Sequence, residues 1–321
     1  MTDTPLFERV TIIGIGLIGS SLARALKAGG LAGHVAAHDI DAGVRATAEK
    51  LGFADSVHAA LDEAVAGSDL VVLAVPVGVY RATATAMSPH LAAGAIVTDV
   101  GSVKEEVFRA VKPALPAGIH LVPGHPVAGT EHSGPEAGFA DLFKDRWAIL
   151  TPEKGTDEKA VARVAEMWRQ VGSDVEIMEA SHHDRVLAIT SHLPHLIAYT
   201  IVATAADLES QLQGERKGDD VVTTAEVIKY SAGGFRDFTR IAGSNPVMWR
   251  DVFLANKEAV LEMLGRFSED LTALQRAIRW EDGDQLEQLF TRTRDIRRGV
   301  VEARQAGRFQ YTENGDDEAE E

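Results

Sequence analysis

Apolar residues in the first 180 positions gather in short runs, and a segment with helical periodicity follows most of these runs. Runs of this length, rich in Val and Ile, are typical of parallel strands that helices cover on both faces. The alternation predicts a doubly wound, Rossmann-type α/β domain over residues 1–180. The expected strands lie within 9–14, 34–41, 68–77, 94–103 and 118–124, and residues 173–180 are expected to add the last strand of the same sheet.

The pattern changes at Ser181, because the apolar residues beyond it recur at helical spacing with few strand signals. This change predicts an all-α C-terminal domain over residues 181–311. Asn245 and Pro246 are expected to begin one of its helices, as N-cap and first helical residue. The long helices are expected at 181–209, from 246 to about 279, and near 284–305.

Long helices rich in Leu, Val and Met leave apolar faces that a second copy of the chain would cover, so we expect a homodimer through this domain. The last segment, residues 312–321, is acidic and lacks large apolar side chains. Such a composition cannot bury enough apolar surface to offset the entropy of ordering, and a disordered tail is predicted there.

Composition narrows the function. The 321 residues carry a formal net charge of −16, which argues against nucleic acid as a partner, since that binding draws on clustered Lys and Arg. Cysteine is absent, which excludes disulfides and thiolate chemistry. Acids stand where a signal peptide would carry bases, and no apolar run approaches the roughly 18 residues of a membrane span. We therefore expect a soluble cytoplasmic protein that binds no membrane.

The first expected strand ends in a glycine turn, Gly14, Gly16 and Gly19, and a helical segment follows. In the G-x-G-x-x-G pattern the glycines permit a tight turn, the approach of a pyrophosphate to backbone N–H groups, and close packing of helix on strand. Asp39 follows the next strand, 20 residues beyond the last glycine, where a carboxylate that binds the cofactor's ribose is expected. That carboxylate would repel a 2′-phosphate, and Arg45 lies a turn and a half further on, so NAD is favoured over NADP.

Ligands of such sheets bind beyond the carboxyl ends of the strands. The loops after Pro76, Asp99 and Val122 are therefore expected to face the cofactor, and they bring Ser102, Lys104 and His125 to one crevice. The residues expected to contact the dinucleotide are Gly14, Gly16, Leu17, Ile18, Gly19, Asp39, Val75 and Pro76.

His125 stands between Gly124 and Pro126, in a stretch that makes a poor helix and a poor strand. The sequence predicts a loop whose glycines and proline hold the histidine on a stiff mount. An imidazole held in this way beside the cofactor is a candidate general base.

Four histidines, His182, His183, His192 and His195, invite a metal hypothesis. Pro194 is expected to break the helix that would align the last two, and no acid or cysteine completes a ligand set, so no metal is predicted. The expected interpretation of His182, His183 and His195 is a packed or solvated side chain, whereas for His192 a chemical role is left open.

The segment 231–251 places guanidinium groups among apolar side chains, in a chain otherwise rich in acids. For Arg240, an anionic substrate group is the favoured partner. For Arg236 and Arg250, pairing with surface acids is not rejected.

These motifs carry a resemblance. The stretches GIGLIGSSLA, DVGSVK, HPVAGTE, SHLPH and GGFRDFTRIA…NPVMWRD, in this order between about residues 8 and 305, resemble the prephenate and arogenate dehydrogenase family of tyrosine biosynthesis. The resemblance implies a nucleotide-binding domain, a helical dimerisation domain, and NAD-dependent oxidative decarboxylation of a cyclohexadienyl acid.

The resemblance also implies roles for individual residues. His125 would be the base for the substrate hydroxyl, and Ser102 would hydrogen-bond this histidine and fix its tautomer. His192 would meet the substrate's ring region, and Arg240 would bind a carboxylate. The pocket would be lined by Thr130, Glu131 and Trp249.

Two other functions stay open at this point. The first is another NAD-linked enzyme, such as a 3-hydroxyacid dehydrogenase or an imine reductase. The former would want a catalytic lysine after the domain boundary, and residues 181–210 contain none. The second is a non-enzymatic NAD-sensing module, which would need the glycine turn but not His125, Ser102 and Arg240 together.

Overall fold

A computed structural model describes residues 4–130, 132–215 and 233–302. The chain divides into two compact units, Met1–Met263 and Leu264–Glu321. The first unit holds both sheets and the helices up to the beginning of α12, and the second holds the rest of α12 together with α13.

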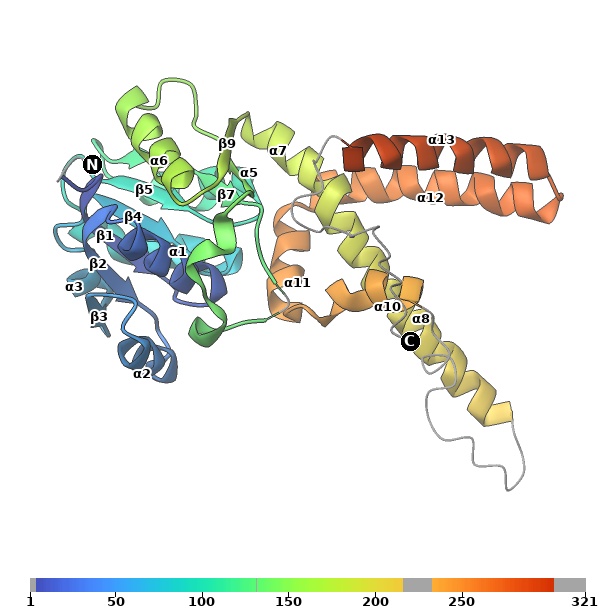
Figure 1. The fold of residues 1–321 in the computed structure, drawn as a ribbon, viewed down its shortest axis with the longest axis horizontal. Coiled ribbons are helices and arrows are strands. Elements are labelled where there is room, and N and C mark those ends of the chain that lie inside the picture. The colour runs from blue at the N-terminus through green and yellow to red at the C-terminus, as the bar shows by residue number, and fades with distance from the viewer. Residues whose placement is uncertain (1–3, 131, 216–232, 303–321) are drawn as a thin grey trace, which may run out of the picture. The chain divides into compact units, whose positions relative to one another are not determined.

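A six-stranded parallel sheet forms the centre of the first unit, with the strand order β3-β2-β1-β4-β5-β6 (Figure 1). Strand β1 pairs with β2 on one side and with β4 on the other, which is the reversal of winding that defines a doubly wound sheet. The predicted fold class is confirmed. The strands are β1 Phe7–Ile13, β2 Ala32–His38, β3 Ser56–His58, β4 Leu70–Leu73, β5 Ile96–Asp99 and β6 His120–Leu121.

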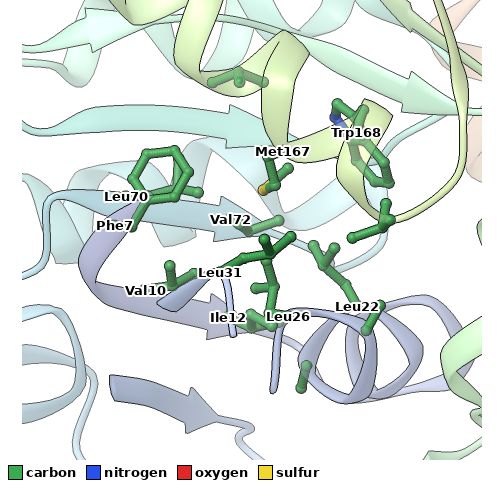
Figure 2. Close-up of a cluster of buried hydrophobic side chains, with 14 of the residues drawn as sticks. Phe7, Val10, Ile12, Leu22, Leu26, Leu31, Leu70, Val72, Met167 and Trp168 are labelled. Carbon is green, nitrogen blue, oxygen red and sulfur yellow. The ribbon is translucent and has the colours of Figure 1, made fainter. Parts of the chain in front are cut away.

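Alternate residues of the central strands face opposite layers of the core. Val10 and Ile12 of β1 pack with α1 and α6, as Figure 2 shows, in a cluster that includes Leu22 and Trp168. Ile13 belongs to the cluster on the other face, together with side chains of α4 and α5. Because helices cover both faces, these strands bury side chains on both sides of the sheet. The helices of this half are α1 Leu17–Ala28, α2 Ala42–Leu51, α3 Leu61–Val65, α4 Tyr80–Met87, α5 Lys104–Ala110 and α6 Glu158–Gln170.

A second sheet of three strands has the order β7-β8-β9, with β7 Gly124–Pro126, β8 Trp147–Leu150 and β9 Asp174–Ile177. Two expectations are corrected here. The strand expected within 173–180 as the last of the main sheet belongs to this second sheet. His125, expected in a loop, lies on β7, because antiparallel pairing with β8 holds its backbone extended opposite Ile149.

The chain enters its helical region through α7 Ala180–Leu187, a π-helical turn η6 Ala188–His192, and α8 Leu193–Glu215. The break expected at Pro194 does not occur. Proline lacks an N–H, and its ring needs room in the preceding turn. The wider π turn, in which the N–H of Leu193 bonds to the carbonyl of Ala188, brings the chain to Pro194 without ending the helix.

This continuous helix corrects the expectation that no apolar stretch approaches the length of a membrane span. The helix Ala180–Leu208 contains an 18-residue window with a mean hydropathy of 1.5, so it is long and apolar enough to cross a membrane by length and composition alone. The same helix carries the buried polar side chains of His183, Asp184 and His192.

The following helices are α10 Gly233–Thr239, α11 Pro246–Ala255, α12 Lys257–Arg279 and α13 Gly283–Glu302. Asn245 caps α11 as predicted, since its side chain accepts the N–H groups of Val247 and Met248. The single helix expected from 246 to about 279 is divided at Asn256, whose backbone leaves the helical conformation.

Several expectations fall partly or wholly outside the described residues. These are residues 303–305 of the last helix, the acidic tail 312–321, and Glu131. The predicted boundary at residue 180 stays a prediction. The remaining short elements are η1 Val77–Val79, η2 Ser88–His90, η3 Lys112–Ala114, η4 Pro135–Ala137, η5 Ala140–Phe143 and η7 Arg240–Gly243.

Candidate active site

The glycine turn joins β1 to α1 at the point where the sheet reverses its winding. Gly14 has a φ of +90°, and a Cβ there would lie 2.6 Å from the carbonyl oxygen of Ala74. A Cβ on Gly19 would lie 2.0 Å from the oxygen of Gly14. Gly16 differs, because a Cβ on it would meet nothing within 4 Å. Two glycines are thus required by packing, and the third leaves an open approach to the amino end of α1, which fits a pyrophosphate.

The other residues expected to hold the cofactor surround this turn. Leu17 and Ile18 form the half-buried first turn of α1, and Val75 lies against Gly14, where a Cβ would approach its side chain to 2.8 Å. Pro76 is exposed at the carboxyl end of β4. The backbone thus offers a cradle at this edge of the sheet.

Asp39 follows β2, and its carboxylate accepts the N–H groups of Ile15 (3.1 Å) and Asp41 (3.0 Å). The first contact orients the carboxylate beside the glycine turn. Arg45 lies closer than its sequence position suggests, because its guanidinium donates to the carbonyls of Asp39 (2.8 Å) and Ile40 (2.9 Å). A cation therefore lies next to the residue expected to exclude NADP.

A buried ion pair holds the residue that precedes His125. Asp99 and Lys104 are both fully buried, and the ammonium group lies 2.5 Å from the carboxylate and 2.5 Å from the carbonyl oxygen of Gly124. The N–H of Gly124 donates to the same carboxylate at 3.1 Å. Burial lowers the pKa of Lys104, and Asp99 opposes this effect. The mount of His125 is thus a tether to β5 and pairing with β8, rather than local proline and glycine stiffness.

His125 is 7% exposed, and its Nδ1 atom lies 2.9 Å from Nε2 of His183. His183 is fully buried on α7, and its Nδ1 atom lies 2.7 Å from the carboxylate of Asp184. Burial lowers the pKa of His125 well below 6.5, and His183, Lys104 and His192 lower it further. Burial also lowers the pKa of His183, against the opposing effect of Asp184. Both imidazoles are therefore neutral near pH 7.

This contact corrects one expectation. Ser102, expected to fix the tautomer of His125, is half-buried and forms no hydrogen bond to it within the described chain. His183 occupies Nδ1 instead, and its full burial agrees with the packed side chain expected at that position. The other ring nitrogen, Nε2 of His125, makes no hydrogen bond to the described residues and is available to a substrate.

His192 is fully buried, and its Nδ1 atom lies 3.1 Å from the amide nitrogen of Asn256. The same amide nitrogen donates to the backbone carbonyl of Asp184 at 2.8 Å. The Nε2 atom of His192 is buried without a hydrogen-bond partner among the described residues. Burial, opposed by Asp184, lowers the pKa of His192 to about 4.

His195 stacks on Trp249, with ring centroids 3.6 Å apart, and its Nδ1–H donates to the carbonyl of Ser191. Burial lowers the pKa of His195, and the hydrogen bond to that carbonyl opposes the effect. The charge of the exposed Arg240 lowers this pKa further. Trp249 also packs against Val103, next to Ser102. Aromatic, cationic and imidazole groups thus gather where the helices meet the nucleotide-binding sheet.

The remaining candidates are not brought into this cluster. Thr130 is exposed, and its hydroxyl accepts a backbone N–H two residues later. Glu131 lies outside the described residues. Arg250 is exposed and pairs with Asp251 at 2.7 Å, and Arg236 is exposed. Of the three arginines, Arg240 is the one whose charge lowers the pKa of His195.

The glycine turn and the buried imidazole lie at the carboxyl edge of a doubly wound sheet. This arrangement defines a dinucleotide-dependent dehydrogenase. Models of the prephenate dehydrogenase nucleotide-binding domain and of the prephenate dehydrogenase dimerization domain match residues 22–177 and 179–292. The chain belongs to the prephenate dehydrogenase family.

Known relatives agree over most of the chain. A cyclohexadienyl dehydrogenase of Zymomonas mobilis is 42% identical over 292 residues, which cover 91% of this chain and 96% of the relative. The crystal structure of Aquifex aeolicus prephenate dehydrogenase, a complex with hydroxyphenyl propionate and NAD⁺, has a TM-score of 0.80 and 34% identity, and covers 91% of this chain and 98% of that one. Synechocystis arogenate dehydrogenase has a TM-score of 0.73 and 25% identity, and covers 91% and 99%.

These findings confirm the family resemblance, the enzyme class and NAD as the cofactor. A 3-hydroxyisobutyrate dehydrogenase of Salmonella typhimurium, with a TM-score of 0.52 and 16% identity, shares the fold alone.

Proposed function

We propose that this chain catalyses the NAD-dependent oxidative decarboxylation of prephenate, arogenate or both. The products are 4-hydroxyphenylpyruvate from prephenate and tyrosine from arogenate, so the reaction belongs to tyrosine biosynthesis. The observation that carries the proposal is the position of His125. Its Nδ1 atom is engaged by His183, and its Nε2 atom is open at the sheet edge that carries the glycine turn.

The family substrate is a cyclohexadiene with a ring carboxylate, a hydroxyl opposite it, and a side chain that ends in a second carboxylate. The hydroxyl proton passes to Nε2 of His125 as the carbinol carbon releases a hydride to the bound NAD. The resulting ketone is conjugated through the ring double bonds to the carbon that bears the ring carboxylate. Loss of carbon dioxide leaves a phenolate, which takes up a proton to become the phenol. Aromatisation supplies the driving force, and the protein contributes a base and orientation.

The remaining groups bind and orient the substrate in this proposal. Arg240 pairs with a carboxylate beside the His195–Trp249 stack, and His192 meets the ring region. Thr130, Glu131 and Trp249 would line the substrate pocket. Ser102 stays a candidate for contact with the substrate side of His125, because His183 occupies the other side.

The test is an assay of NADH formation by the purified protein with NAD and prephenate, and then with NAD and arogenate. Formation of the phenolic product in step with NADH from at least one substrate supports the proposal. NADH formation from a 3-hydroxyacid and from neither cyclohexadienyl acid would replace it with the first rival function. NAD binding without turnover of any of these substrates would favour the sensing module.

We also propose that two copies associate as a homodimer in the cytoplasm. The matched dimerization-domain model supports association through the helices. Large apolar side chains are exposed on these helices, and exposed apolar surface of this kind is typical of an interface. They include Ile189, Ile201 and Leu208 in the first unit and Ile278, Trp280 and Phe290 in the second. Light scattering of the full chain tests the mass, and a monomer at micromolar concentration would contradict the proposal.

A further inference from the structure

Three buried polar residues have no role in the proposed reaction, although they contact its histidines. His183 and Asp184 lie on α7, and Asn256 lies between α11 and α12. All three are at most 5% exposed. Buried polar groups cost free energy unless they are hydrogen-bonded, so the direction of each hydrogen bond they make is informative.

The first chain of hydrogen bonds runs from Asp184 to His125. The carboxylate of Asp184 accepts the N–H groups of Lys104 (2.8 Å) and Glu105 (2.9 Å), and acts as an acceptor. Towards His183 it therefore also accepts, which puts the imidazole proton on Nδ1. Neutral His183 then has a lone pair on Nε2, and this atom accepts the Nδ1–H of His125. The Nε2 atom of His125 is left unprotonated, as a base requires.

The second chain of hydrogen bonds runs from Asp184 to His192. The backbone carbonyl of Asp184 can only accept, so the atom of Asn256 that faces it must be the amide nitrogen. This nitrogen also faces Nδ1 of His192, which therefore accepts. Neutral His192 carries its proton on Nε2, the atom buried without a partner in the described chain. The second series of hydrogen bonds thus makes Nε2 of His192 a donor, whereas the first makes Nε2 of His125 an acceptor.

We infer that Asp184 is a positioning residue that sets the two active-site histidines in opposite tautomers, His125 as a proton acceptor at Nε2 and His192 as a hydrogen-bond donor at Nε2. The carboxylate acts through His183, and the backbone carbonyl acts through Asn256. The inference rests on the proposed function, since an alcohol oxidation needs a base for the hydroxyl proton and gains from a donor to a substrate oxygen.

Two features of the molecule agree with this role. When the hydroxyl O–H bond breaks and the proton moves to His125, the new imidazolium faces neutral His183, and the Asp184 carboxylate behind it stabilises the charge. The same carboxylate binds the first N–H groups of α5, directly after the loop that carries Ser102. A carboxylate at the amino end of a helix is favoured by the helix dipole.

The direct test is ¹⁵N NMR of the full-length protein labelled in histidine, with and without NAD. Imidazole ¹⁵N shifts distinguish protonated from unprotonated ring nitrogens, and the signals are assigned by their loss in His125→Asn and His192→Asn. We expect His125 protonated at Nδ1 only and His192 protonated at Nε2 only. The opposite tautomer at either ring overturns the inference. This outcome is independent of which substrate turns over, so the proposed function can fail separately.

Kinetics supply the second test. Asp184→Asn and His183→Phe should lower kcat by about 10²-fold or more, with the KM for NAD changed less than threefold, because the wrong tautomer removes the base and not the cofactor. His182→Gln is the matched control, an exposed histidine next to His183, and should leave kcat unchanged. Folded variants that keep wild-type kcat, or that lose NAD affinity as much as kcat, would overturn the inference.

Discussion

The glycine turn and the histidine cluster are built in opposite ways. The turn acts through the backbone of residues 14–19, and its side chains matter chiefly by being absent. The cluster acts through side chains from β7, α7, η6 and the break after α11, held by contacts across 58 to 72 positions of sequence. In the proposed function, a local feature binds the cofactor, and a long-range network prepares the reactive groups. Changes in one region should separate cofactor binding from turnover.

The largest separation is expected for His125→Asn. The asparagine removes the proton acceptor and leaves the glycine turn intact, so kcat should fall by about 10²–10⁴-fold. NAD affinity, measured by titration, should change little. A variant that retains more than about a tenth of wild-type kcat would remove His125 from this role.

The pH dependence follows from the same residue. Burial, His183, Lys104 and His192 hold the pKa of His125 well below 6.5, so the base is already unprotonated at pH 7. The rate should be flat near neutrality and should fall only in acid, through an ionisation that the variant lacks.

The second prediction compares two glycines of the turn, Gly19 and Gly16. A Cβ on Gly19 would collide with the oxygen of Gly14, so Gly19→Ala should destabilise the fold by about 1–3 kcal/mol. Gly16 has room for a methyl group and an ordinary φ of −71°, so Gly16→Ala should fold normally. That methyl would occupy the approach to α1 and should weaken NAD binding about tenfold, or 1.4 kcal/mol.

Thermal unfolding and NAD titration of both variants check this pair. An equal loss of stability in Gly16→Ala and Gly19→Ala would mean that both glycines serve packing alone. The proposed role of Gly16 in leaving room for the cofactor would then be wrong.

Acid should weaken the histidine cluster. An unfolded histidine binds a proton near pH 6.5, whereas His192 binds one only near pH 4, so the unfolded state takes up protons first. Stability should therefore fall as pH drops from 6.5 to 4, by about 3 kcal/mol from this residue. Denaturant unfolding across this range measures the slope, which His192→Gln should flatten and His182→Gln should leave unchanged. Parallel slopes in wild type and His192→Gln would contradict the assignment.

The same contrast explains what the sequence could predict. The sheet, the glycine turn and the place of Asp39 follow from periodicity and short spacings, because each is decided within one strand-turn-helix unit. The stretch around His125 was recognisable by its residues, but not its conformation, because β7 exists only by pairing with β8, more than 20 positions away. The helix break expected at Pro194 was wrong because a π turn relieves the proline.

The network residues were the least predictable. His183 and Asp184 are adjacent in sequence, but nothing local shows that one faces His125 and the other caps α5. The sequence predicts Asn256 as an interior residue of a long helix, whereas its role depends on the helix ending there. An acid beside a histidine, close to a second histidine motif, was the available signal.

Arg240 should affect substrate binding more than catalysis. The chain carries a net charge of −16, so a dianionic substrate depends on local guanidinium contacts. A charge-assisted hydrogen bond contributes about 1.5–3 kcal/mol, and Arg240→Gln should raise the substrate KM about 10- to 100-fold with a smaller change in kcat. Lysine should rescue poorly, because it lacks the fork.

Arg250→Gln is the matched control, since this exposed arginine already pairs with Asp251. A raised KM in this variant, together with an unaltered KM in Arg240→Gln, would move the carboxylate site to Arg250.

The smallest effect is expected at Asp39. This residue is the exception to the contrast between the two regions, because here a side chain contributes to a site that is otherwise formed by the backbone. Its carboxylate is held by the N–H groups of Ile15 and Asp41, and Arg45 lies against the same loop. Asp39→Ser should weaken NAD and improve NADP, each by about tenfold, since the carboxylate accepts from the ribose and repels a 2′-phosphate. The gain in NADP should depend on Arg45, whose guanidinium is then the nearest cation. Adding Arg45→Gln should abolish that gain without restoring NAD. Dissociation constants of both cofactors for the two variants decide the matter. If wild type already uses NADP as well as NAD, Asp39 does not select the cofactor.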